Sequence, residues 1–145
     1  MANRNWASGG KMYSMHVKPV IINATIQIGA SGAVSSFVGS AVASVTQVST
    51  GVYKLTLQRD TNFSRLYFAA GAMQSASAAI SGISVVEVQH APNAAVSASP
   101  ATLTVTCLAP TSSSNTTLVA TNPASGSALN VILMASDSSV LINGE

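Results

Sequence analysis

Apolar and polar residues alternate in short runs along this chain, with the period of a β-strand that buries one face. In "IINATIQI", Ile22, Ala24, Ile26 and Ile28 alternate with Asn, Thr and Gln. In "TLTVTCLA" (residues 102–109), Leu, Val and Cys alternate in the same way with three threonines. Because these runs are rich in β-branched residues and lack helical periodicity, they predict strands.

About ten short strands follow from this pattern, separated by turn-forming Gly, Pro, Asn and Ser at intervals of roughly 8–14 residues. Such spacing predicts an all-β fold, an antiparallel β-sandwich or jelly roll, with a closed barrel as the alternative. We expect an N-terminal arm over residues 1–18 and one β-sandwich domain over residues 19–145. The candidate strands lie at 12–20, 20–28, 33–40, two within 43–60, and at 64–73, 83–90, 102–109, 116–121, 128–136 and 139–142.

The stretch "ASVTQVSTGVYKLTLQRD" (residues 43–60) predicts a hairpin in the core of the sandwich. Its alternation turns Val45, Tyr53, Leu55 and Leu57 inward. Gly51 lies where a hairpin loop of three to five residues often needs a positive φ. The end of this stretch carries Lys54, Arg59 and Asp60, which we expect to pair with neighbouring subunits.

Charge is scarce: 48% of the residues are hydrophobic and only 7% are charged, against an average near 25%. A surface with so little charge favours association, so the composition indicates a subunit that packs against other subunits. The charge-free stretch 66–86 is long enough to cross a bilayer. Its Gln74, serines and glycines argue against a membrane helix, and no signal peptide precedes it, which predicts synthesis in a cytoplasm.

The first 18 residues carry a net charge of +3 and no acid, whereas the remainder carries −1. A basic extension ahead of a near-neutral body predicts docking on an acidic partner, with a frayed terminus as the alternative. The arm also contains large apolar side chains, which favours an ordered arm. The candidate contact residues are Arg4, Trp6, Lys11, Tyr13 and Lys18.

Catalytic and metal-binding patterns are weak. Cys107 has no basic neighbour in sequence and is expected to be a small core residue. Asp60, His90 and a serine could be proposed as a triad, but the context of a nucleophile elbow is missing. His16 and His90 have no ligand spacing. The sequence therefore predicts no enzyme, no cofactor, no metal site and no nucleic-acid partner.

The stretch "NRNWASGGKMYSMHVKPV", followed by "IGASGAV" and "VASVTQVSTGVYKLTLQ", resembles small virion proteins of tailed bacteriophages over roughly residues 3–70. The resemblance implies a capsid decoration, or cement, protein that carries no catalytic residues. Such a protein forms a homotrimer on the outer surface of the capsid, over junctions of the major capsid protein lattice. Its partners would be the major capsid protein and itself, and neither nucleic acid nor membrane.

Two other functions remain open on the sequence. A tail-fibre, spike or head-fibre module that binds a host glycan would need an exposed aromatic platform built from Phe37, Tyr53, Phe63, Tyr67 and Phe68. A hydrolase would depend on His90.

Overall fold

The computed structural model describes residues 19–58, 63–75, 83, 85–89, 102–111 and 117–137. These residues form strands joined by short turns, and none of them belongs to a helix long and apolar enough to cross a membrane. The strands are β1 Pro19–Ile28, β2 Val34–Gly39, β3 Val42–Ser49, β4 Val52–Leu57, β5 Phe63–Gln74, β6 Val85–Gln89, β7 Thr102–Pro110, β8 Leu118–Ala120 and β9 Ala128–Asp137, with a 3-10 turn at Ala30–Gly32.

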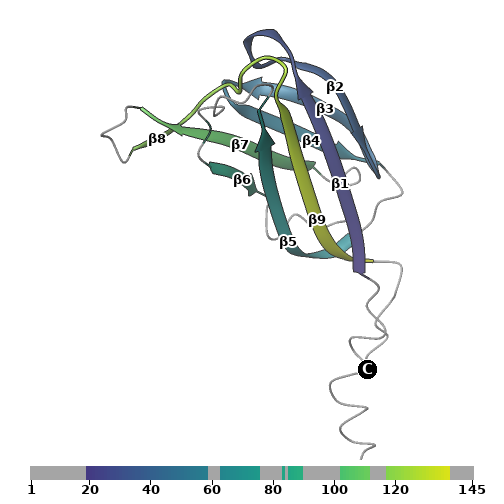
Figure 1. Ribbon diagram of the computed structural model, residues 1–145. Coiled ribbons are helices and arrows are strands. Elements are labelled where there is room, and N and C mark those ends of the chain that lie inside the picture. The colour runs from purple at the N-terminus through teal and green to yellow at the C-terminus, as the bar shows by residue number, and fades with distance from the viewer. Residues whose placement is uncertain are drawn as a thin grey trace, which may run out of the picture.

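The strands pair into two antiparallel sheets that pack face to face (Figure 1). Sheet A has the strand order β2-β1-β9-β5, and sheet B has the order β3-β4-β7-β6. β8 pairs with residues 108–110 of β7, beyond Thr106, which is the partner of Val52 at the start of β4. The predicted antiparallel β-sandwich is therefore confirmed, whereas the predicted arm, residues 1–18, lies outside the described residues.

The core lies between the sheets and follows the alternation of the sequence. The inward rows predicted for β1, β4 and β7 are all buried, and Val45 of β3 is buried as well. Tyr53 is the largest fully buried side chain, and its hydroxyl donates a hydrogen bond of 2.8 Å to the carbonyl oxygen of Gly32. The buried core residues of the central strands are Ile22, Ala24, Ile26, Ile28, Tyr53, Leu55, Leu57, Leu103, Val105, Cys107, Leu129, Val131 and Leu133.

Strand limits differ from the pattern at a few places. Pro19 begins β1, as expected for a residue that cannot donate to a sheet, and the candidate strand 20–28 is confirmed as β1. Of the candidate strand 12–20, residues 12–18 lie outside the described residues. Of the described residues 117–121 of the candidate 116–121, Leu118–Ala120 form a strand. The candidate 139–142 lies outside the described residues.

The side chain of Asn122 joins three separate turns at one end of the sandwich. Its Oδ1 accepts hydrogen bonds from Gly51 N (2.7 Å) and from Gln47 Nε2 (2.9 Å). Its Nδ2 donates to the carbonyl oxygen of Ser31 at 2.8 Å. Gly51 has φ 67°, the positive value predicted for this hairpin loop. Because the chain turns here, the Gly51 amide lies outside the hydrogen-bond ladder between strands, and the side chain of Asn122 is its partner.

At the opposite edge of the sandwich, β5 of sheet A approaches β6 of sheet B at Gly71. A Cβ at this position would overlap Cγ1 of Val86 and lie 3.1 Å from its Cβ. Val86 is half-buried against the core, and its branched side chain has little freedom to turn away. Glycine at position 71 therefore allows β5 of sheet A and β6 of sheet B to pack closely along this edge.

We expect Asn122→Ala to lower the free energy of unfolding by about 2 kcal/mol, because it leaves the Gly51 amide and the Ser31 carbonyl without their partner. Urea unfolding measures the change. Asn130→Ala, which removes one side-chain hydrogen bond with Thr25, is the matched control and should cost under about 1 kcal/mol. Equal losses for the two variants would contradict a special role for Asn122.

We expect Gly71→Ala to destabilise the protein by about 1–3 kcal/mol, the usual cost of overpacking. Val86→Ala should recover part of that loss when it is combined with Gly71→Ala, because it removes the atom that the new Cβ meets. A double-mutant cycle on urea midpoints measures this coupling. Strictly additive losses would show that the two residues do not compete for space.

Candidate interaction surfaces

The outer face of sheet A, turned away from the core, exposes large apolar side chains. Ile21 of β1 lies opposite Met134 of β9, which in turn lies opposite Phe68 of β5, and Ile132 adjoins this row along β9. The exposed fractions are 63% for Ile21, 54% for Phe68, 45% for Ile132 and 39% for Met134. We call these four residues the apolar patch. Such clustering on a sheet face makes this patch a candidate surface for association.

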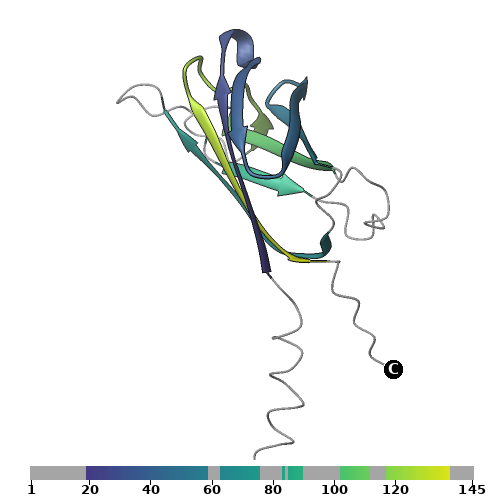
Figure 2. The ribbon, with the colours of Figure 1, turned by 90° about the vertical axis from the view of Figure 1, so that its right-hand side faces the viewer.

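The patch lies toward one end of sheet A. β1 begins and β9 ends there, and Figure 2 shows the long strands of sheet A extending past those of sheet B at this end. Any segment that precedes Pro19 therefore joins the sandwich beside the patch, two residues from Ile21.

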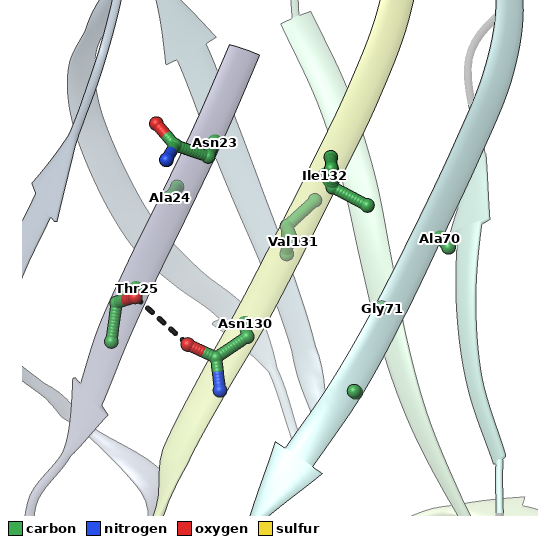
Figure 3. A pocket seen from close by; sticks show the side chains of 9 residues that line it. Asn23, Ala24, Thr25, Ala70, Gly71, Asn130, Val131 and Ile132 are labelled. Carbon is green, nitrogen blue, oxygen red and sulfur yellow. Dashed lines mark hydrogen bonds between the residues drawn. The ribbon is translucent and has the colours of Figure 1, made fainter. Parts of the chain in front are cut away.

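A shallow groove of about 280 Å³ adjoins the patch on the same face (Figure 3). It is concave because β5 contributes only Ala70, Gly71 and Ala72 there. Thr25 donates a hydrogen bond of 2.8 Å to Oδ1 of Asn130 across β1 and β9. The other lining residues are Asn23, Ala24, Val131 and Ile132, so the groove is lined by amides, a hydroxyl and small apolar groups, without charge.

The outer face of sheet B has a different chemistry. Threonines from β3, β4 and β7 cover it, and the charged side chains that the structure describes, Lys54 and Glu87, both lie on it. Lys54 is exposed between Thr46 and Thr104, and Glu87 accepts a hydrogen bond of 2.8 Å from Gln89. Apart from the exposed Val48 and Val85 on its edge strands β3 and β6, this hydroxylated and charged face is suited to water, in contrast to the outer face of sheet A.

A second apolar feature is the hairpin formed by the end of β7 and by β8, which projects from one side of the sandwich (Figure 1). The Thr111 amide donates to the Thr117 carbonyl at 3.2 Å, which extends the pairing past Pro110. Leu118 and Val119 are 41% and 40% exposed on it. A ribbon of two strands is marginally stable without a surface to pack against, so this hairpin is also a candidate contact.

Of the residues predicted to bind partners, Lys54 is the one that the structure describes, and it lies on sheet B, far from the apolar patch in the sheet topology. The others, Arg4, Trp6, Lys11, Tyr13, Lys18, Arg59 and Asp60, lie outside the described residues. The apolar patch and the hairpin were missed from the sequence. The signal for the patch was the unbroken apolar run of residues 131–134, in which a strand is apolar on both faces.

Catalytic chemistry has little to build on in the described residues. They contain no group of three His, Cys, Asp or Glu side chains that could hold a metal ion. Cys107 is fully buried, as predicted, and burial raises the pKa of its thiol to about 11. His16 and His90 lie outside the described residues.

The aromatic residues proposed for a glycan platform do not share one surface. Tyr53 is in the core, where burial and, to a smaller extent, the nearby Cys107 raise its pKa to about 12. Phe37 is half-buried against the core, and Phe68 belongs to the apolar patch. The side chains of Phe63 and Tyr67 lie outside those that the structure describes.

Comparisons of the chain with protein-family models, with curated proteins and with solved structures found no match.

We expect the free energy of unfolding to fall between about pH 9 and about pH 11. The unfolded chain loses the Cys107 proton near 9.0, the ordinary value, whereas the folded chain keeps it until about 11, and Tyr53 acts in the same direction from 10.0 to about 12. Each group costs about 1.4 kcal/mol per pH unit between its own two pKa values, so Cys107 acts alone from about pH 9 to 10 and both groups act from about pH 10 to 11. Urea unfolding at several pH values measures the slope. Cys107→Ala should flatten it, and an unchanged slope would exclude a contribution from the thiol.

Proposed function

We propose that this protein is a structural virion protein that decorates the head of a tailed bacteriophage. In this proposal it binds as a homotrimer on the outer surface, over junctions of the major capsid protein lattice. The observation that carries the proposal is the outer face of sheet A, where Ile21, Phe68, Ile132 and Met134 are exposed together. The resemblance of residues 3–70 to phage virion proteins and the low charge of the chain support it.

Burial of the apolar patch between neighbouring copies would supply the binding energy of the trimer. Each square ångström of apolar surface removed from water contributes about 25 cal/mol, and a specific interface buries about 800 Å² per partner. The patch and the adjoining groove span three neighbouring strands, which gives a broad and nearly flat surface for such a contact. Three copies on one lattice site would add avidity, because the second and third contacts become intramolecular.

The basic arm would provide the contact with the capsid. It carries +3 within residues 1–18, and it enters the sandwich at Pro19, beside the patch. Arg4, Lys11 and Lys18 would meet acidic groups of the lattice, and Trp6 and Tyr13 would anchor the arm, since aromatic and arginine residues dominate interface energies.

Deleting residues 2–18 tests this division of roles. We expect the shortened protein to keep its β-sheet circular dichroism but to lose at least tenfold in affinity for heads that lack the decoration protein. Pelleting of heads with bound protein measures the affinity. In the same pelleting assay, the variant Lys54→Ala, on the outer face of sheet B, tests the partner role predicted for Lys54.

Unchanged occupancy of the heads after the deletion would exclude the arm as the capsid anchor. Labelling of virions with an antibody against the protein separates the alternatives further. Label on the head supports decoration, whereas label on a fibre, together with binding on a glycan array, would support the host-binding module instead.

A further inference from the structure

The two apolar features of the sandwich lie on different surfaces. The groove and the apolar patch belong to the outer face of sheet A, whereas Leu118 and Val119 project on the hairpin at the end of sheet B. A two-fold contact uses one self-complementary surface, but a ring of three needs two different surfaces that fit each other. The chain displays such a pair.

We propose that the β7–β8 hairpin of one copy packs into the groove on the outer face of sheet A of the next copy, head to tail. This inference rests on the homotrimer of the proposed function and names the surfaces that would form it. Leu118 is the side chain that enters the depression over the strip Ala70–Ala72, whereas Val119, the next residue of β8, lies on the other face of the ribbon, opposite the buried Ala109.

The chemistry of the two surfaces matches. No charged residue occurs in the hairpin, over residues 108–111 and 117–120, or in the lining of the groove. The contact would therefore bury no unpaired charge. An average protein surface carries many charges, which makes a second copy of this charge-poor chain the better occupant. Asn23 and Asn130 at the rim of the groove supply hydrogen-bonding groups for the backbone of β8, which pairs with β7 on one side.

The contact would also explain the hairpin itself. Beyond Leu108, β7 has left β6, and its pairing continues with β8. Ala120, Val119 and Leu118 are all exposed in the single chain. Packing on a neighbouring sheet would give this short ribbon the apolar support that two strands alone lack.

Cysteine cross-linking tests the contact. Leu118→Cys and Ala70→Cys are placed on two full-length chains with different affinity tags, which are expressed together and oxidised mildly. We expect a disulfide-linked pair that carries both tags on a non-reducing gel. Native Cys107 is buried in the core and stays out of this reaction. The control pair is Val48→Cys with Ala70→Cys, since Val48 is 61% exposed on β3, away from both surfaces, and should give no such product.

Sedimentation gives a second readout. Leu118→Glu and, separately, Ile132→Glu should each reduce the mass from three times 14.6 kDa to that of one chain, because each would bury an unpaired carboxylate in the contact. Val48→Glu should leave the trimer intact. Circular dichroism confirms that each variant folds.

The outcomes separate the two proposals. The mixed-tag disulfide together with a trimer supports the head-to-tail contact, even if the protein fails to bind phage heads. A trimer that survives Leu118→Glu, or a trimer that gives no mixed-tag product, would overturn this contact but leave the decoration function standing. A monomeric native protein would overturn the contact and the trimer together.

Discussion

Burial of every second side chain between the two sheets holds this protein together, and the rest of the structure is arranged around it. Ile26, Leu55, Val105 and Leu129 come from the central strands of both sheets and are fully buried. The polar end of Tyr53 is accommodated because its hydroxyl reaches the carbonyl of Gly32. Since the core accepts no charge, the charged side chains that the structure describes, Lys54 and Glu87, lie on an outer face.

The outer faces of the two sheets differ in chemistry. In an antiparallel sandwich the outward residues are normally polar. Sheet B follows this rule with threonines, Lys54 and Glu87. Sheet A departs from it, because β9 is apolar on both sides: Val131 and Leu133 face the core while Ile132 and Met134 face out. A strand of this kind is suited to burial on both faces, and in a single chain only one of them is covered.

The sequence predicted the inward rows because a period of two residues is a local property that each strand shows by itself. Ile22 to Ile28 and Leu103 to Cys107 could be read in this way. The order of the strands could not be read, since spacing along the chain does not say that β1 lies beside β9. The apolar patch could not be predicted for a related reason. Where two or more apolar residues are consecutive, as at Ile21 and Ile22 and at residues 131–134, the pattern does not say which of them face outward until the register is known. The role of Asn122 could not be predicted because its hydrogen-bond partners are 71 to 91 positions away in the sequence.

The pairing of β1 with β9 also determines when the complete apolar patch can form. Pro19 and Ser136 are partners, so the two middle strands of sheet A come from opposite ends of the described chain. Contacts of such long sequence separation form late and slowly in folding. During synthesis, β1, β2 and the strands of sheet B leave the ribosome before β9 does. Ile21 and Phe68 therefore remain on separate strands until β9 arrives between them, and no partial chain can display the complete patch.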